Sequence, residues 1–264
     1  MSTIRAAAVA GTFYPADPGQ LAGMIDFLLA QVLVAPEDAP PLALIVPHAG
    51  YVYSGPVAAS AYARLTPWRG SITRVVVAGP AHRVPVKGLA LSSVDGFATP
   101  LGVVPVDRAA NRMLLDRPGV YVDDRAHAQE HGIEVHLPFL QRSLDDGWSL
   151  VPIVAGNAAA AMVAEALDGF WGEPGTLIVI SSDLSHFHDA RTARRLDAAT
   201  ATAIVAAEWE TLDGDDACGA VPLRGALALA RDHGEHIELV DLRNSADTSG
   251  PSDRVVGYAS FVVR

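Results

Sequence analysis

Residues 41–50, PLALIVPHAG, form an apolar run that ends in a histidine, and two later stretches repeat this arrangement. Residues 74–82 read RVVVAGPAH, and residues 176–186 read TLIVISSDLSH. Each run is rich in aliphatic residues and is bounded by Pro, Gly or Ser, which is typical of a strand buried on both faces. We therefore expect three strands that each deliver one histidine to their carboxyl ends: His48, His82 and His186.

Around these runs, short β-branched segments alternate with Ala- and Leu-rich segments of helical period. Strands are predicted at residues 5–9, 42–46, 74–78, 87–92, 101–105, 149–154, 176–181, 237–242 and 255–263. Helices are predicted at residues 18–34, 56–65, 108–116, 134–144, 158–170, 189–208 and 222–232. This order predicts an α/β fold with a largely parallel central sheet and helices on both faces. Nothing resembles a linker between domains, so residues 1–264 are expected to form a single domain, with exposed loops at 35–41 and 244–253.

The composition excludes several classes of function. Half of the 264 residues are hydrophobic, and 30 acidic against 19 basic residues give a formal net charge of −11. This charge argues against binding to nucleic acid or to anionic membranes, and no apolar run approaches the ~20 residues of a membrane helix. A single cysteine rules out an internal disulfide, which is compatible with a cytoplasmic protein. The chain also lacks the Walker, HExxH, GxGxxG and GxSxG motifs.

Three imidazoles at one edge of a sheet predict a site, most simply a metal site, because ligands of open α/β sheets bind beyond the carboxyl ends of the strands. Imidazole favours iron, copper or zinc over calcium and magnesium. Cys218 is the candidate for a further, anionic ligand. Its place just before a predicted helix is expected to lower the pKa of the thiol. The alternative is that Cys218 is a small buried apolar residue.

The segment EHGIEVHLP, residues 130–138, adds four titratable side chains. His131 either points into the same crevice as the strand-end histidines or belongs to a solvated helix start that has Glu134 in its first turn. Asp183 either orients a ligand imidazole or caps a turn.

Other candidates are weaker. Tyr51 and Tyr53 are candidate pocket residues, although Tyr53 alternatively only packs. His188 is expected beside the site, and three histidines are expected at the surface: His127, His233 and His236.

Six motifs in this order and spacing resemble the Memo-like family, whose prokaryotic members are often named AmmeMemoRadiSam system protein B. They are PHAGYVYSG (47–55), GPAHRVPVKGLALSS (79–93), FATPLGVVPVD (97–107), EHGIEVHLPFLQ (130–141), SSDLSHF (181–187) and ACGAVPL (217–223). The resemblance extends from about Gly11 to Val263, nearly the whole chain.

The resemblance implies a fold similar to the class III extradiol ring-cleaving dioxygenases, which use non-haem Fe(II). The family positions that match His48, His82 and Cys218 form the metal site. The position of His186 resembles the catalytic base of the dioxygenases, and His131 resembles their further active-site histidine. Gly132, which follows it, is closer to the dioxygenase pattern than the serine common in Memo relatives. True dioxygenases use two histidines and a carboxylate, whereas the matching motif here supplies a thiol.

Three functions are therefore expected to compete. The first is an oxidoreductase of dioxygenase type that uses Fe(II) or copper; zinc is a further metal that the site could bind. The second is a non-enzymatic metal- or peptide-binding adaptor, because animal relatives are linked to signalling through protein partners. The third is a partner of a radical-SAM protein, which the prokaryotic family name suggests. In the first two, the metal pocket would receive a small molecule or a peptide.

Overall fold

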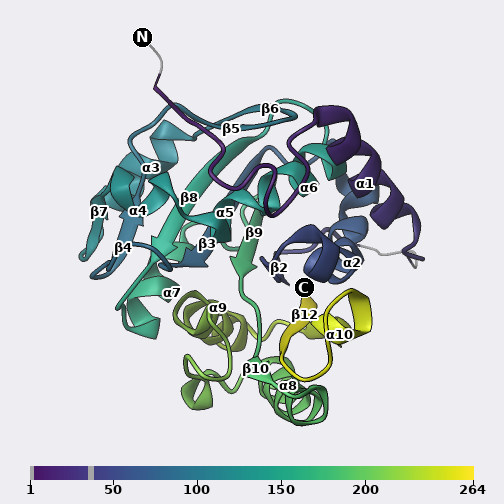
Figure 1. Cartoon of the computed structure of the whole chain (residues 1–264). Coiled ribbons are helices and arrows are strands. Elements are labelled where there is room, and N and C mark those ends of the chain that lie inside the picture. Colours follow the sequence, from purple (N-terminus) through teal and green to yellow (C-terminus); the bar gives the residue numbers. More distant parts are fainter. Residues whose placement is uncertain (1–2, 35–38) are drawn as a thin grey trace.

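The computed structural model describes residues 3–34 and 39–264 and has a mixed β-sheet at its centre (Figure 1). The strands follow the order β10 (His186–His188), β12 (Val255–Val263), β2 (Ala43–Val46), β9 (Thr176–Ser181), β3 (Arg74–Pro80), β8 (Ser149–Ala155), β4 (Leu89–Leu91) and β7 (Val120–Val122), with β11 (Ile237–Asn244) paired to β12. Strands β2, β9, β3 and β8 are parallel. The flanks add antiparallel pairs, so the predicted α/β fold is confirmed and its sheet is parallel mainly at the centre.

Both faces of the central strands are buried, which explains why their sequences are continuous apolar runs. In β2, Ala43 and Ile45 belong to one hydrophobic core, whereas Leu44 and Val46 belong to the core on the other face. Strands β3 and β9 alternate in the same way. The sheet therefore separates two cores, and its central strands are buried along nearly their whole length.

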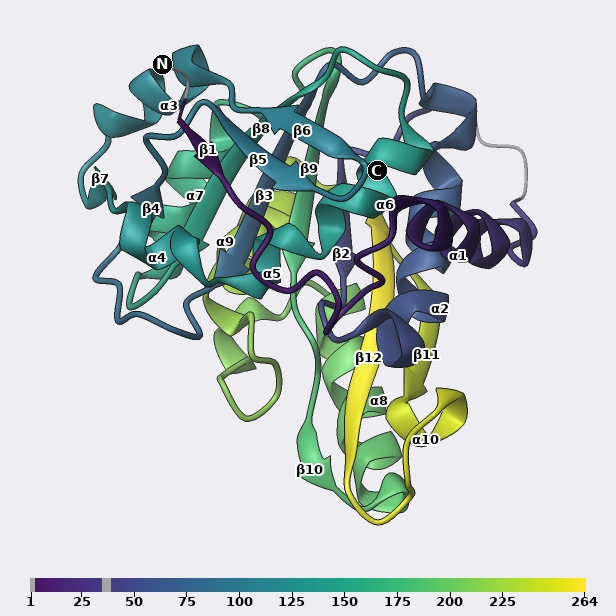
Figure 2. The same cartoon turned by 45° about the horizontal axis from the view of Figure 1, so that its top comes forward.

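Helices cover the sheet on both sides (Figures 1 and 2). One core includes residues of α3 (Arg108–Leu115), α7 (Ala160–Asp168), α8 (Ala190–Val205) and α9 (Ala220–His233). The other includes residues of α1 (Pro18–Ala30), α2 (Tyr51–Tyr62), α5 (His131–Glu134), α6 (His136–Ser143) and a small sheet of β1 (Ile4–Arg5), β5 (Gly96–Thr99) and β6 (Gly102–Pro105). The connections contain η1 (Ala63–Trp68), α4 (Asp124–Ala128), η2 (Trp209–Thr211) and α10 (Ser245–Thr248). No helix among the described residues is long and apolar enough to cross a membrane.

Several predicted boundaries are wrong. Helix α2 begins at Tyr51, directly after Gly50, and contains Pro56 in its interior rather than in its first turn. Burial of most of this helix offsets the backbone hydrogen bond that a proline cannot donate. The helix predicted at 134–144 is divided at Val135 into α5 and α6. The strand predicted at 5–9 is only Ile4–Arg5, which pairs with β5 outside the central sheet.

Two further predictions concern irregular segments. The segments at 87–92 and 101–105, which we expected to form an antiparallel pair, contain β4 and β6 of two different sheets: β4 pairs with β7 and β8, whereas β6 pairs with β5. Of the predicted loops, residues 35–38 lie outside the described part of the chain. The segment 244–253 contains helix α10, which Asn244 begins with a capping box.

Candidate metal centre

Two of the three histidines lie where the strand pattern places them. His48 follows β2 by two residues, and His82 follows β3 by two residues. Their ring centroids are 5.0 Å apart. His186 differs, because β9 ends at Ser181 and the chain then continues into β10, which pairs antiparallel with β12. The prediction of a third strand-end histidine on β9 is therefore wrong.

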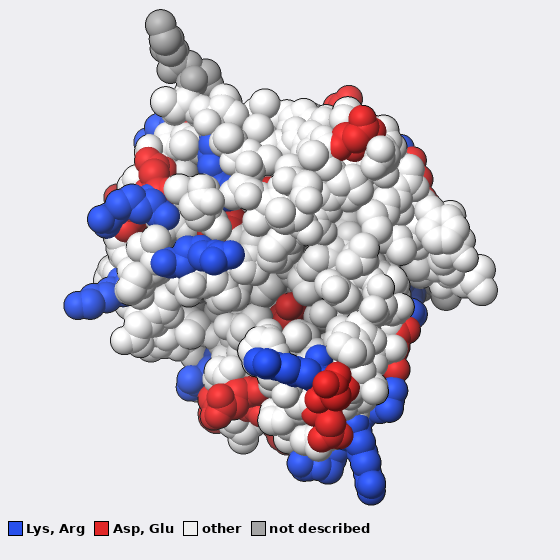
Figure 3. All heavy atoms as spheres, in the orientation of Figure 1, with Lys and Arg blue, Asp and Glu red and all other residues white. Residues whose placement is uncertain are grey.

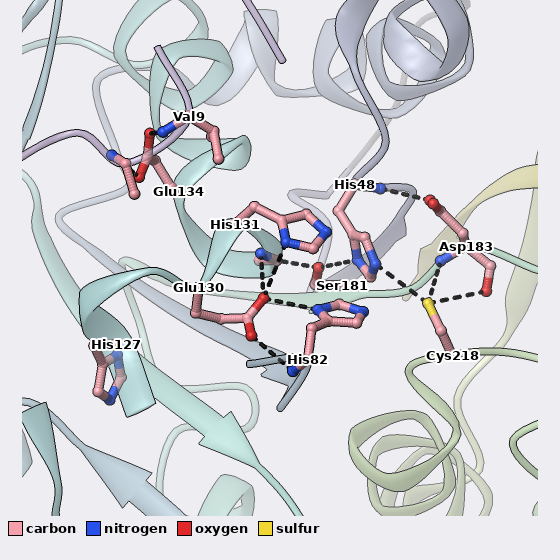
Figure 4. Close-up of polar contacts among 12 residues, drawn as sticks. Val9, His48, His82, His127, Glu130, His131, Glu134, Ser181, Asp183 and Cys218 are labelled. Atoms are coloured by element: carbon pink, nitrogen blue, oxygen red, sulfur yellow. Dashed lines mark hydrogen bonds and ion pairs between the residues drawn. The ribbon is translucent and has the colours of Figure 1, made fainter. Parts of the chain in front are cut away.

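Cys218 completes the group that His48 and His82 begin. It lies in the turn before α9, and its Sγ is 3.2 Å from His48 Nε2 (Figure 4). One donor atom from each of His48, His82 and Cys218 lies within 4.8 Å of the other two. The backbone N–H of Asp183 donates to the same sulfur at 3.3 Å, which fixes the turn against the segment that follows β9.

Hydrogen bonds assign the tautomer of His48. Its Nδ1 lies 2.7 Å from Ser181 Oγ, and the Ser181 hydroxyl donates to the carbonyl of Gly132. A hydroxyl has one proton to donate, so Ser181 must accept a proton from His48 Nδ1. Nε2 of His48 is then unprotonated, and its lone pair faces Cys218 Sγ, whose thiol can donate to it.

Glu130 fixes the tautomer of His82 in a similar way. Its Oε1 lies 2.7 Å from His82 Nδ1, and its Oε2 accepts from the His82 backbone N–H at 2.7 Å. Burial acts to raise the pKa of Glu130, but the hydrogen bonds from His82 and Gly132 outweigh it, so the pKa lies below its usual value. The ionised carboxylate accepts from Nδ1 and leaves Nε2 of His82 free to bind a metal. His82, Glu130 and His131 form a second cluster of donor atoms, but there Glu130 already holds Nδ1 of His82.

His131 opens helix α5 and stacks on His82 with 4.4 Å between ring centroids. Phe13 packs on the ring of His131 at 4.7 Å. Burial first, and then the neighbouring His82, lower the pKa of His131 to about 4, so the ring is neutral near pH 7. The expectation that His131 points toward the strand-end histidines is confirmed, whereas its catalytic role stays a prediction.

His131 and His186 border different hollows. His131 lines a hollow of about 370 Å³ whose other walls include Phe13, Tyr53, Asp183, Arg254 and Tyr258. His186 lines a hollow of about 650 Å³ together with Cys218, Phe187, His188 and the loop 214–216. His186 thus approaches the site from the side of the sulfur, and its predicted role as a base stays a prediction. His188 is exposed beside it, as expected.

The thiol of Cys218 does not have the low pKa that its place before α9 predicted. Burial, followed by the charge of Asp183, raises the pKa of Cys218 to about 12. These effects exceed the favourable field of the helix N-terminus. Burial also holds the pKa of His48 well below its usual value, with the nearby histidines adding to this effect. A bound cation would favour the thiolate and the neutral imidazole alike.

Asp183 and the two tyrosines have roles that can now be distinguished. Asp183 accepts from the backbone N–H of His48 at 2.7 Å, so the structure favours its role in the turn over a bond to the imidazole ring. Tyr51 is buried and donates to the carbonyl of Val135, whereas Tyr53 lines the hollow beside His131.

His127, which was expected at the surface, is buried, and so is Glu134, which one alternative placed in a solvated helix start. His127 is 1% exposed, and its Nε2 lies 3.0 Å from the carbonyl of Ala90. Glu134 is fully buried and accepts from the Arg5 guanidinium and the Tyr14 hydroxyl. It also accepts from the backbone N–H groups of Ala8 and Val9 (Figure 4). Glu134 therefore anchors the N-terminal segment that carries Phe13 to His131. His233 and His236 are exposed, as expected.

The family model described as Memo-like protein matches residues 5–262. The chain belongs to the Memo-like family. A MEMO1 family protein of Aquifex aeolicus is 36% identical over 270 residues, which cover 98% of each chain. MEMO1 family proteins of Saccharolobus solfataricus and Saccharolobus islandicus are each 32% identical over 277 residues, which cover 96% of this chain and 97% of theirs.

In this Memo-like protein, the supporting residues Ser181 and Glu130 were not singled out from the sequence. Ser181 is the last residue of β9, paired in register with Val46 of β2, and this register brings it next to His48. A polar residue at the end of an apolar strand was the available signal for Ser181. For Glu130, the signal was its position directly before His131.

Proposed function

We propose that this Memo-like protein is a mononuclear metal-dependent oxidoreductase of dioxygenase type. His48, His82 and Cys218 would hold the metal, with Fe(II) as the first candidate and copper as the alternative. Zinc also suits these donors, but it is not redox-active and would fit only the non-enzymatic metal-binding function. One observation carries the proposal: hydrogen bonds at Nδ1 leave Nε2 of both histidines unprotonated, and these histidines lie beside a thiol and a hollow large enough for a ligand.

The donor set fits such a metal. Two neutral imidazoles and a thiol suit iron, copper or zinc, whereas magnesium and calcium prefer oxygen ligands. Three protein donors leave further coordination positions for other ligands. Bound there, a redox-active metal would supply O₂ activation and would acidify a substrate hydroxyl. Because ring cleavage places both oxygen atoms of O₂ in the product, the reaction requires no external reductant.

The surrounding residues have distinct tasks in this proposal. His131 is neutral and faces the hollow, so it can accept a proton from a hydroxyl of a ligand bound there. His186 is available as the second base on the side of Cys218. Ser181 and Glu130 hold the tautomers of the ligand histidines. Since thiol ligands need a reducing compartment, we also propose a cytoplasmic location.

Metal binding is tested first. Protein prepared without oxygen and loaded with Fe(II) is expected to retain about one metal ion per chain, and Cys218→Ser and His48→Ala are expected to lose most of it. His236→Ala alters an exposed histidine and serves as the matched control. If Cys218→Ser binds metal with unchanged stoichiometry and affinity, Cys218 is not a metal ligand and has only a structural role.

Activity is tested next by oxygen uptake over a panel of catechols. His131→Gln and His186→Gln are expected to lower kcat by about a hundredfold while metal content stays unchanged, as for loss of a general base. A fully loaded protein that consumes no oxygen with any member of the panel would rule out ring cleavage. The non-enzymatic metal- or peptide-binding function would then replace it. Co-purification would test the third function, a partnership with a radical-SAM protein.

A further inference from the structure

The hollow beside His131 has an apolar wall and two charged side chains at different depths. Phe13, Tyr53, Val256 and Tyr258 provide aromatic and aliphatic surface. Asp183 lines it and is only 4% exposed, whereas Arg254, which also lines it, is exposed. Figure 3 shows this face of the molecule, with an acidic group set back near its centre and both basic and acidic side chains toward its lower edge. A ligand here would meet the buried carboxyl group of Asp183 at the bottom and the Arg254 cation at the rim.

Arg254 is held in place at this rim by an aromatic ring. Its guanidinium carbon lies 4.4 Å from the ring centroid of Phe187. Phe187 itself has a φ of 65°, a left-handed conformation that is unusual for a residue with a large side chain. Such conformations persist where the surrounding structure enforces them, and they cluster at functional sites. Stacking on Phe187 leaves the N–H groups at the guanidinium edge available to an incoming anion.

From this arrangement we infer that the hollow binds a single-ring aromatic acid, with its carboxylate at Arg254 and its uncharged end toward His131. The reverse orientation is disfavoured, because the buried carboxyl group of Asp183 at the bottom offers no counter-charge to a ligand carboxylate, whereas the guanidinium of Arg254 does. The volume of about 370 Å³ lies at the small end of the range of about 300–1,000 Å³ for ligand pockets, which suits one ring rather than a larger molecule. The inference rests on the proposed function for the identity of the site, and it adds the class of substrate.

Binding is measured without turnover, by titration of metal-free protein under nitrogen with 4-hydroxybenzoate and with its neutral analogue 4-hydroxybenzamide. The acid is expected to bind about fivefold to tenfold more tightly, as for a charge-assisted hydrogen bond that is partly exposed to water. The advantage of the acid should fall as salt is added, while the affinity of the amide stays constant.

Variants of Arg254 and Phe13 distinguish the contribution of the cation to binding from that of the apolar wall. Arg254→Gln should remove the preference for the acid without weakening the amide, and Arg254→Lys should keep part of it. Phe13→Ala should weaken both ligands to the same extent. Arg125→Gln is the control, because Arg125 of α4 is exposed, pairs with the N-cap residue Asp123 and does not line the hollow.

Equal affinities for acid and amide, or a preference that survives Arg254→Gln, would overturn the inference. Affinities that Phe13→Ala leaves unchanged would overturn the placement of the ring. Neither result depends on oxygen uptake. If the protein prefers the acid but consumes no oxygen with any catechol, aromatic acids remain its class of ligand and only the dioxygenase function is ruled out.

Discussion

The hydroxyl of Ser181 lies 2.7 Å from Nδ1 of His48, on the opposite side of the imidazole ring from Cys218. Because the same hydroxyl donates to the carbonyl of Gly132, one serine connects β9, the loop after β2 and the first turn of α5. The ring is thereby fixed in the tautomer and orientation that a metal would need. Residues that do not touch the metal should therefore control its affinity.

Ser181→Ala is expected to lower metal affinity about tenfold to a hundredfold, the usual effect of removing a residue that orients a ligand histidine. The variant also leaves the Gly132 carbonyl without its donor. Competition with a chromophoric chelator measures the affinity, with Ser71→Ala at an exposed serine as the control. An affinity equal to that of the wild type would show that the Ser181 bond does not orient His48.

Glu130→Gln tests the support of His82. The amide keeps the shape of the carboxylate, but its NH₂ group would face either the backbone N–H of His82 or the donor at Nδ1. We expect about tenfold weaker metal binding and a loss of about 1–3 kcal/mol in the free energy of unfolding, since a buried donor loses its acceptor. Urea unfolding of the metal-free variant separates the two effects. Metal affinity that remains normal would assign Glu130 to stability alone.

The Arg5–Glu134 pair should be important for stability, because both side chains are buried. Arg5→Met leaves the carboxylate of Glu134 without its counter-charge, and breaking such a pair typically costs about 3–5 kcal/mol. Arg69→Met removes an exposed ion pair with Asp145 and is expected to change little. Equal urea midpoints for the two variants would contradict this assignment.

Gly219 is placed where a side chain cannot fit. A Cβ atom there would lie 2.3 Å from the carbonyl oxygen of Ser181 and 2.6 Å from Cβ of Ser182. Gly219→Ala should push the Cys218 turn away from the end of β9 and reduce metal binding, while α9 itself remains folded. Metal content and circular dichroism measure the two outcomes. Gly214→Ala, at a glycine with open space around it, is the control, and a full metal complement in Gly219→Ala would show that the turn can shift freely.

The stability of the metal-free protein should fall in acid because of buried neutral histidines. Burial lowers the pKa of His127 to about 4, below the usual value of 6.5 in the unfolded chain. Between these values the unfolded state binds one proton more, so the free energy of unfolding falls as the pH drops from 6.5 to 4. One such histidine contributes up to about 1.4 kcal/mol per pH unit. His127→Gln should reduce this slope and exposed His233→Gln should not; identical slopes would locate the proton uptake elsewhere.

The apolar runs predicted the central strands well, because strands buried on both faces must be continuously apolar. They could not predict where His186 lies, since LSH continues past the sheet edge into a second strand with its own partner. The start of α2 was missed because Gly50 has no side chain to form a recognisable cap.

The sequence predicts the metal-donor residues of the candidate site, but it does not predict the residues that hold them in place. His48, His82 and Cys218 converge as the family motifs imply. The burial of Glu134 and His127 depends on partners far along the chain, such as Arg5, and one sequence does not show which residues meet. The position of Arg254 likewise follows from the path of the turn before β12.

Strand β12 pairs directly with β2, although more than 200 residues separate them along the chain (Figure 1). A ribosome releases β2 early and β12 late. At about 5–20 residues per second, the segment that carries His48 waits roughly ten to forty seconds for this neighbour. During that interval β2 has an open edge, and Cys218 has yet to reach the imidazole. Under the proposed function, insertion of the metal in a cell would therefore follow translation of nearly the whole chain. A nascent chain that stalls before Cys218 would expose two histidines able to bind metal only weakly.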